Sequence, residues 1–505
     1  MNGEAVIIGC GAAGLSAALF LARHNCKSVL VADMPPERSQ SGLALGGINA
    51  ALGEDDSAEK HARDTCSAGC FLADAAAIRG MTDAAPKIVD ELECLGAVFR
   101  KNYDRTYALR MMGGHSCGRT VHANGGIGRQ VMDALSQEFH RHADAGRIQC
   151  RFGWRFHRLG WRNAKVCGAW ICHMESGESA FIPGPVLMAS GGLNGLFGLT
   201  TGSVANTGEA AASLFADGVP FSNLEFIQFH PTTLRLRNKC LLISESARSD
   251  GGRLFVRKGD KEFYFMEDKY PDHGNLMPRD IVSREEWHWL SSGHQVFLDL
   301  RHLPDASRKQ LLDTCGTYLH LTGMDPAVQP VPVEPGIHYF MGGIQVDALH
   351  HTPVEGLYAA GECASQYHGA NRLGGNSLLG AIYGGMTAAR EILGHSFPPL
   401  RTLVSAPRSD TLPGGLPFQP IMRKAMGVVR DERGLAAALE ALDKQKHQGP
   451  VIPLCRAMLF SAMARRESRG SHCRSDFPEC GEDFSKNSIA VFSNGDIRIS
   501  WKDVV

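Results

Sequence analysis

Six residues near the start of the chain carry the first recognisable chemistry. Gly9-Cys10-Gly11-Ala12-Ala13-Gly14 follows an apolar run over 5–8 and opens a helix expected over 14–24. Glycines at these spacings allow a tight turn and a close backbone approach, so a pyrophosphate can sit on the helix N-terminus. Asp33 ends the next expected strand, 28–32, where an acid binds a ribose hydroxyl. The spacing therefore predicts a dinucleotide site.

Two later glycine turns indicate which dinucleotide. Ala189-Ser190-Gly191-Gly192 ends a strand expected from residue 186, and Gly361-Glu362 ends one expected from residue 357. Such returns, far apart in the sequence, suit a long cofactor that stays bound more than a nicotinamide that must exchange. A second glycine motif of the first kind is absent from the sequence. The pattern favours FAD over NAD.

A second group of residues combines cationic, imidazole and hydroxyl side chains in stretches rich in loop signals. Each alone is more often structural than functional. Together they suit a pocket for an anion with two carboxylates, because arginine grips carboxylates bidentately. The group comprises His230, Ser244, Arg248, Arg279, His338 and Arg372, together with one acid, Glu245.

The elements that must position these residues follow an α/β plan. The strand–helix–strand opening predicts a Rossmann-like, doubly wound FAD-binding domain over 1–226. Residues 227–335, richer in proline, arginine and histidine, are expected to form an inserted α+β capping domain. Strand and glycine patterns return over 336–400. A C-terminal helical region and tail are expected over 401–505, after a proline-rich linker and with strand-like alternation near the end.

Composition excludes several classes of partner. The 505 residues include 52 Lys+Arg and 53 Asp+Glu, which gives no electrostatic reason for nucleic acid or an anionic membrane. Glycines interrupt the apolar run over 5–22, so we expect no membrane insertion. The 15 cysteines are scattered without a CxxC pair, which predicts free thiols, a cytoplasmic location and no metal site. Glycine accounts for 57 of the 505 residues, which is more than its usual share of about 7%.

An ordered set of motifs carries a family resemblance. From about residue 5 to 478, the chain resembles the flavoprotein subunits of fumarate reductase and succinate dehydrogenase, and the related L-aspartate oxidases. The motifs that carry the resemblance are GCGAAG, LALGG, GGHS, ASGG, QFHPT, PRD, HYFMGG, GLYAAGE, HGANRLGGNSLL and RRESRGSHCRSDFP.

The resemblance implies a reaction and a role for each matched residue. In the family, hydride passes between flavin N5 and one olefinic carbon of a dicarboxylate such as fumarate, while a proton goes to the other carbon. The arginine of the PRD motif donates this proton, and here it is Arg279. Its relay partners match Glu245 and Arg248. The substrate-binding positions match His230, Ser244, His338, Arg372 and Met112. An iron–sulfur or other electron-donor subunit is an implied partner.

The cofactor set follows from the glycine motif and the resemblance together. The residues expected to bind FAD are Gly9, Gly11, Ala12, Ala13, Gly14, Asp33, Ser39, Gln40, Ser41, Gly46, Gly47, Ala189, Ser190, Gly191, Gly192, Glu209, Gly361, Glu362, Arg372, Ser377 and Leu378. Membrane-bound relatives attach FAD covalently through a histidine that Gln40 replaces here. An amide cannot form that bond, so we predict non-covalent FAD and the reductive direction or an oxidase role.

The sequence leaves several related acids as candidate substrates. L-Aspartate oxidases carry a glutamate for the substrate ammonium just before the GGHS motif, where this chain has Met112. This replacement favours fumarate, because a buried ammonium without a counter-charge is costly. The alternatives are an L-aspartate oxidase, a reductase of another enoate and a non-catalytic electron-relay subunit. The stretch after Pro478 is shorter than in the longer dehydrogenases, so a surface that docks an iron–sulfur subunit is expected to be altered or missing.

Overall fold

A parallel sheet forms the centre of the N-terminal half. The computed structural model describes residues 4–203, 205–237, 239–304, 307, 311–395, 417–445, 449 and 451–504. All five strands run parallel, and four of them are buried throughout, as expected for strands covered on both faces. In the fifth, an edge strand over Ile148–Phe152, only Ile148 is buried. In spatial order they are β19 (Leu357–Ala359), β10 (Val186–Met188), β1 (Ala5–Ile8), β2 (Ser28–Ala32) and β6 (Ile148–Phe152).

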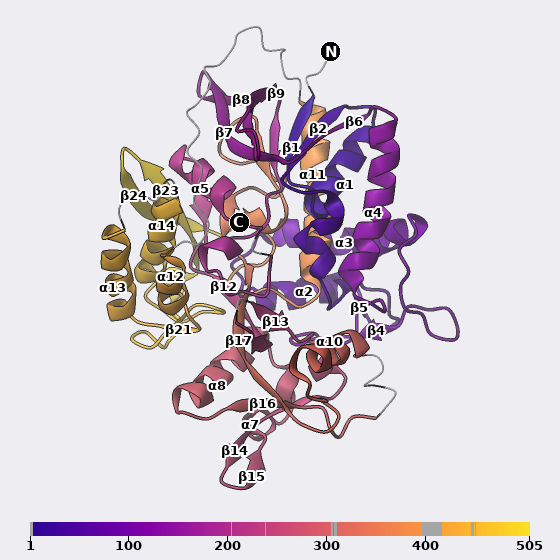
Figure 1. Cartoon of the computed structure of the whole chain (residues 1–505), viewed down its shortest axis with the longest axis vertical. Helices are drawn as coiled ribbons and strands as arrows, with labels where there is room; N and C mark the ends of the chain where they lie inside the picture. The colour runs from indigo at the N-terminus through magenta and orange to yellow at the C-terminus, as the bar shows by residue number, and fades with distance from the viewer. Residues whose placement is uncertain are drawn as a thin grey trace.

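Helices and a small antiparallel sheet pack against this centre, and a second small sheet lies below it in Figure 1. Helix α1 packs against α4 and α11, and α11 also contacts α3. The helices are α1 (Ala12–Arg23), α2 (Ala58–Ala68), α3 (Ala75–Cys94), α4 (Ile127–Asp144), α5 (Glu209–Ala216) and α11 (Asn376–Gly394). The small antiparallel sheets comprise β7 (Trp154–Arg162), β8 (Lys165–His173) and β9 (Ser179–Pro183), and β3 (Ile48–Asn49), β5 (Thr120–Val121) and β4 (Leu109–Arg110).

A six-stranded antiparallel sheet lies at the bottom of Figure 1. Its spatial order is β13 (Cys240–Leu242), β12 (Ile227–Arg235), β17 (Val331–Phe340), β16 (Val296–Asp299), β14 (Arg253–Lys258) and β15 (Lys261–Phe263). Helix α8 packs on β12 and β17. The helices of this region are α6 (Ser246–Ser249), α7 (Phe265–Lys269), α8 (Arg279–Ser291) and α10 (Leu312–Thr322). An apolar core separate from that of the parallel sheet fills the region.

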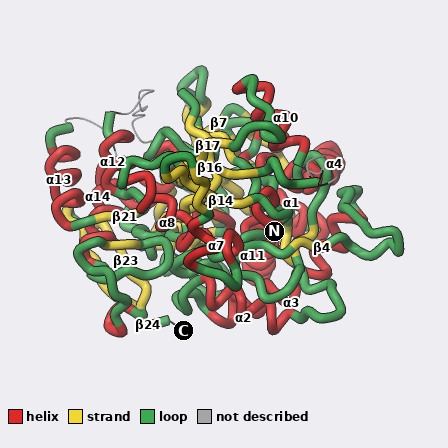
Figure 2. Tube along the Cα trace, turned by 90° about the horizontal axis from the view of Figure 1, so that it is seen from below, coloured by secondary structure: helices red, strands yellow, loops and turns green. Residues whose placement is uncertain are grey.

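The C-terminal part adds helices and completes another sheet. Figure 2 shows α13 and α14 on the side opposite α3 and α4. The helices are α12 (Gln419–Ala425), α13 (Glu432–Asp443) and α14 (Val451–Ala464), with β21 (Val429–Arg430) paired to β22 (Cys473–Arg474). The sheet runs β20 (Ala364–Ser365), β18 (Gly343–Gln345), β11 (Phe221–Ser222), β23 (Lys486–Ser493) and β24 (Asp496–Asp503).

The expected elements can now be compared with the observed ones. The strand over 28–32 is confirmed to the residue, and the first helix begins two residues earlier than expected, at Ala12. The strand-like alternation near the end is the hairpin of β23 and β24. The domain boundaries stay a prediction, and β17 runs without a break across the one placed at 335/336. Most of the proline-rich linker lies outside the described residues.

Two chemical expectations also concern the whole chain. The 15 cysteines all lie in the described part of the chain, and no two of them form a disulfide with each other. Among the described residues, no helix combines the length and the apolar character needed to cross a membrane.

Candidate active site

One continuous pocket joins the two groups of residues that the sequence singled out. Its lining includes every expected FAD-binding residue except Gly14. It also includes His230, Ser244, Glu245, Arg279, His338 and Arg372 of the anion group. Gly14 has a different task, because a Cβ there would lie 2.0 Å from the carbonyl oxygen of Gly9. Its small size lets α1 pack tightly against the turn.

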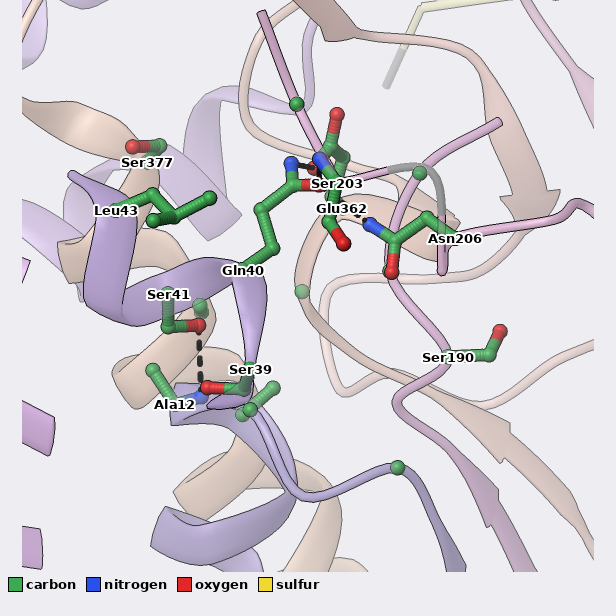
Figure 3. A pocket seen from close by; sticks show the side chains of 18 of the residues that line it. Ala12, Ser39, Gln40, Ser41, Leu43, Ser190, Ser203, Asn206, Glu362 and Ser377 are labelled. Atoms are coloured by element: carbon green, nitrogen blue, oxygen red, sulfur yellow. Dashed lines mark hydrogen bonds between the residues drawn. The ribbon is translucent and has the colours of Figure 1, made fainter. Parts of the chain in front are cut away.

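The glycine turn leaves an open helix end at one part of this pocket. Gly9 has a φ of +111°, and a Cβ there would lie 2.2 Å from the Ala189 carbonyl oxygen. Helix α1 begins without a side-chain cap on Gly11. The amide of Ala12 donates to Ser41 Oγ at 3.0 Å (Figure 3), and the buried hydroxyl of Ser39 has no partner. This cradle fits a pyrophosphate, which would bind the open amides.

Asp33 lies at the end of β2, where the sequence placed it, but it has a partner that the sequence did not indicate. Arg155 on β7 donates to Asp33 Oδ2 at 2.9 Å and to Glu209 Oε2 at 2.8 Å. All three residues line the pocket. Arg155 was missed because no motif surrounds it. It fixes the two carboxylates at the expected ribose end of the cofactor.

Gln40 is held on both sides of its amide group, as Figure 3 shows. Its Oε1 accepts from the Ser203 backbone N–H and from Asn206 Nδ2, each at 2.8 Å. Its Nε2 donates to Glu362 Oε2 at 3.3 Å. Burial raises the pKa of Glu362 to about 7, although the hydrogen bond from the Phe340 amide lowers it. Gln40 thus acts as a hydrogen-bonding wall of the pocket.

Because Gln40 offers no nucleophile, we predict that FAD leaves the protein on denaturation. Acid precipitation of the holoprotein should release all of the yellow colour into the supernatant, where its absorbance measures it. A succinate dehydrogenase flavoprotein with covalent FAD is the control, and its colour should stay in the pellet. Colour retained in the pellet of this protein would show that another residue forms the bond.

A buried ion cluster lies at the other part of the pocket. Arg279 is the first residue of α8, and its Nε and Nη2 donate to Glu245 Oε2 at 2.9 and 2.5 Å. Glu245 Oε1 accepts from the Gly113 amide at 3.1 Å and lies 3.3 Å from Arg248 Nη2. Burial raises the pKa of Glu245, but Arg279 and Arg248 outweigh it and hold the pKa at about 2. Glu245 is therefore ionised at neutral pH.

Gln228 on β12 joins the two arginines of the pocket. Its Oε1 accepts from Arg279 Nη1 and from Arg372 Nη2, each at 2.9 Å. Its Nε2 donates to the Arg372 carbonyl oxygen at 2.7 Å and to Asn371 Oδ1 at 2.8 Å. One fully buried amide thus sets the spacing of both guanidinium groups. Its place in the QFHPT motif, two residues before His230, was the signal available in the sequence.

The two histidines supply hydrogen bonds rather than charge. Their rings lie 5.1 Å apart between centroids, on the neighbouring strands β12 and β17. Thr201 Oγ1 lies 2.7 Å from His338 Nδ1, and Thr232 Oγ1 lies 3.3 Å from His230 Nδ1. Burial, followed by nearby Arg279, lowers the pKa of both rings well below its ordinary value. Both imidazoles are therefore neutral at neutral pH.

The cluster carries a surplus of positive charge. Arg372 stacks on Tyr339, with its guanidinium 4.4 Å from the ring centroid, and forms no ion pair among the described residues. Burial and then Arg279 lower the pKa of Arg372 to about 9, so it stays protonated at neutral pH. Three guanidinium groups therefore stand against Glu245, which is ionised, and Glu362, which is only partly ionised at neutral pH because burial raises its pKa to about 7. The net positive charge that results suits an anionic ligand.

Two residues of the expected set lie behind the pocket wall. Met112 is buried and its Sδ lies 3.5 Å from Ser249 Oγ, outside the lining. Arg248 is buried, contacts Glu245 from behind and donates to the Asn275 carbonyl oxygen. Met112 lies against the pocket-lining Gly46, where a Cβ would be 3.2 Å from Met112 Cε, and its contact with a substrate stays a prediction. Arg248 contacts Glu245, which lines the pocket.

Comparison with known proteins decides the family. Residues 4–378 match the family described as FAD binding domain, and residues 447–505 match fumarate reductase flavoprotein C-term. The succinate dehydrogenase flavoprotein subunit of Bacillus subtilis is 33% identical, covering 95% of this chain and 92% of that protein. The chain belongs to the fumarate reductase, succinate dehydrogenase and L-aspartate oxidase flavoprotein family. This flavoprotein is an FAD-dependent oxidoreductase.

Further relatives of the flavoprotein include both reaction types. The L-aspartate oxidase of Agrobacterium fabrum is 35% identical, covering 94% of this chain and 91% of that enzyme. The quinol fumarate reductase of E. coli has a TM-score of 0.90 and 26% identity, covering 100% of this chain and 97% of that one. The family match also runs past Pro478, where the resemblance in the sequence was expected to stop, to Val505.

Proposed function

We propose that the flavoprotein reduces fumarate, or a closely related unsaturated dicarboxylate, to the saturated acid. The observation that carries this is the net positive charge of the pocket, where Arg279 and Arg372 share Gln228 and Arg248 adds its charge behind Glu245. A dicarboxylate would offset that charge between buried side chains, where each charge interaction is stronger than in water.

The side chains around the ion cluster would have different roles in the reaction. Bound FAD supplies the electrons. Arg372, His230 and His338 would hold and polarise the carboxylates, which favours the negative charge that develops in the transition state. Arg279 would give its proton to the substrate carbon, and Gln228 would hold it at a fixed spacing from Arg372. Glu245 would take part in returning the proton.

L-Aspartate oxidase is the second candidate, because L-aspartate oxidases are among the curated relatives. That substrate needs a carboxylate for its ammonium group. Glu245 is the acidic lining residue beside Arg279, and Arg279, Arg248 and the Gly113 amide already occupy its oxygens. Met112 adds no charge. This argues for fumarate over aspartate. The electron donor, an iron–sulfur subunit or another protein, stays a prediction.

Anaerobic flavin spectroscopy tests the proposed function directly. Dithionite-reduced holoprotein should regain its oxidised absorbance on mixing with fumarate, far faster than with buffer. L-Aspartate added to the oxidised protein should leave the absorbance unchanged. Equal reoxidation rates with fumarate and buffer would overturn the proposal, and bleaching by L-aspartate would establish the second candidate. Other enoates, tested in the same way, define the substrate range.

A further inference from the structure

A cluster of metal-ligand side chains lies at the end of helix α11 that is farther from the pocket. Glu391 lies in the last turn of this helix, and His395 follows its last residue. His351 comes from the segment between β18 and β19. One ligand atom from each of these three side chains lies within 4.8 Å of the others. Imidazole nitrogens and a carboxylate oxygen together form a ligand set typical of Zn²⁺.

His351 already has the orientation of a metal ligand. Its Nδ1 lies 3.0 Å from Asp347 Oδ2, while Asp347 Oδ1 accepts from the backbone amides of Leu349 and His351, each at 2.9 Å. The ring also packs against Tyr358, with 5.3 Å between centroids. The carboxylate keeps the ring proton on Nδ1 and the lone pair on Nε2, as it does behind zinc-binding histidines.

The Nε2 atom of His351 faces Glu391 without a hydrogen bond. It lies 3.4 Å from Glu391 Oε2, is shielded from solvent and has no hydrogen-bond partner among the described residues. Two ligand atoms of a tetrahedral zinc ion, with bonds of about 2.0–2.1 Å, lie about 3.3 Å apart. The separation of these two atoms therefore matches two ligands of one ion.

His395 adds a third ligand from the end of the helix. Its Nδ1 lies 2.9 Å from the Glu391 carbonyl oxygen, which takes the ring proton and leaves the lone pair on Nε2. Its ring lies 5.8 Å from that of His351, at an angle of 79°. The side chain is exposed, so it can turn the short distance toward an ion. The carbonyl dipoles at the C-terminal end of a helix also favour a cation there.

The charged groups around the cluster suit a divalent cation as well. Glu391 and Asp347 bring two carboxylates to His351. Neither carboxylate forms an ion pair with a lysine or arginine in the part of the chain that the structure describes. Arg390, the neighbour of Glu391, lies over the ring of Phe20 instead, 5.7 Å from its centroid. Two carboxylates therefore stand ready to balance the charge of one divalent ion.

We propose that His351, Glu391 and His395 bind one Zn²⁺ ion. Water completes the tetrahedral coordination. Asp347 is a positioning residue, which acts on the ion through His351. The ion joins the end of α11 to the segment before β19, and the first turn of α11, with Ser377, lines the cofactor pocket.

This site differs from the kind of metal site that the cysteines could have formed. The scattered cysteines predicted no metal site, and none of them belongs to the cluster. The ligands are histidines and a carboxylate from two separate segments. Such a set has no local spacing in the sequence, so only the folded chain reveals it.

Zinc binding to the FAD-loaded protein tests the proposal. After EDTA treatment and reduction of the thiols, equilibrium dialysis against Zn²⁺ should show one more bound ion per wild-type chain than per His351→Ala chain. His395→Ala and Glu391→Gln should each weaken the binding of that ion at least about tenfold. Asp347→Asn should weaken it about 10–100-fold, the usual effect of losing the partner of a ligating histidine.

The matched control is an exposed histidine that contacts one carboxylate. His140 lies 3.0 Å from Glu37, and His140→Ala should bind as much zinc as the wild type. An equal loss in His140→Ala and His351→Ala would show non-specific surface binding and would overturn the proposal. So would a wild type that binds no zinc, because His351 would then simply form ion pairs with its two carboxylates.

Two further measurements identify the ligands and the connection that the ion makes. X-ray absorption at the zinc edge should show nitrogen and oxygen at about 2.0–2.2 Å, without sulfur at about 2.3 Å. Sulfur scattering would place the ion on cysteines and overturn the proposal. Zn²⁺ should also raise the Tm of the wild type, since a ligand that binds the folded state stabilises it. An equal rise in His351→Ala would contradict the site.

Discussion

Replacing Arg279 by alanine should lower kcat for fumarate reduction by about 10³-fold or more while FAD stays bound. A positioned proton donor contributes about 10²–10⁴-fold, and removal of its charge also weakens transition-state stabilisation. Arg279 is buried against Glu245 and Gln228 and lines the pocket. Stopped-flow reoxidation of the reduced flavin measures the rate, and the flavin-to-protein absorbance ratio measures occupancy.

Two further variants make that result specific. Arg257→Ala removes an exposed arginine of the same region, on β14, and should leave kcat unchanged. Arg279→Lys keeps the charge but loses the planar fork that contacts Glu245 and Gln228 together, so it should recover little of the rate. If Arg279→Ala retains wild-type turnover, Arg279 is not the donor.

Replacing Arg465 by methionine should lower the free energy of unfolding by about 3–5 kcal/mol, the cost of leaving a buried charge unpaired. Arg465 is 0% exposed, and it donates to Glu225 at 2.6 Å and to Glu467 at 2.9 Å. It also donates to the carbonyl oxygens of Phe484 and Lys486, at 2.7 and 2.8 Å. Urea unfolding, followed by tryptophan fluorescence, measures the loss.

The control for this variant is an arginine pair at the surface. Arg456 contacts Asp443, with 35% and 52% of the side chains exposed, and such pairs contribute at most about 1 kcal/mol. Arg456→Met should therefore lower the free energy of unfolding by no more than that. If both variants lose the same free energy of unfolding, the buried network around Arg465 contributes no more to stability than a surface ion pair does.

The start of the expected FAD-binding domain could be predicted because its sequence signals are local. A glycine turn between a buried strand and a helix needs only neighbouring residues, and the strand over 28–32 and the helix at Ala12 follow from it. The residues of the anion group could be predicted from their chemical types, and the family resemblance assigned a role to each of them. The structure brings His230, Ser244, Glu245, Arg279, His338 and Arg372 to one pocket.

The remaining features depend on contacts between distant segments. Arg155 reaches Asp33 from a strand more than a hundred residues away, and Gln228 joins two arginines from different parts of the chain. Single polar residues of this kind have no local pattern. The position of Met112 behind the wall could not be predicted either, because motif spacing does not determine which side of a loop faces the pocket.

The sheet that contains β11 has a consequence for how the chain folds. Phe221 of β11 pairs with Ala490 of β23, about 270 residues later, and Ile344 of β18 pairs on its other side. During synthesis β11 therefore leaves the ribosome long before its partners, with both edges exposed. Pairings so distant in sequence are slow to form, and unpaired strand edges promote aggregation. Chaperone binding to the nascent chain should therefore be strongest between the synthesis of β11 and that of β23.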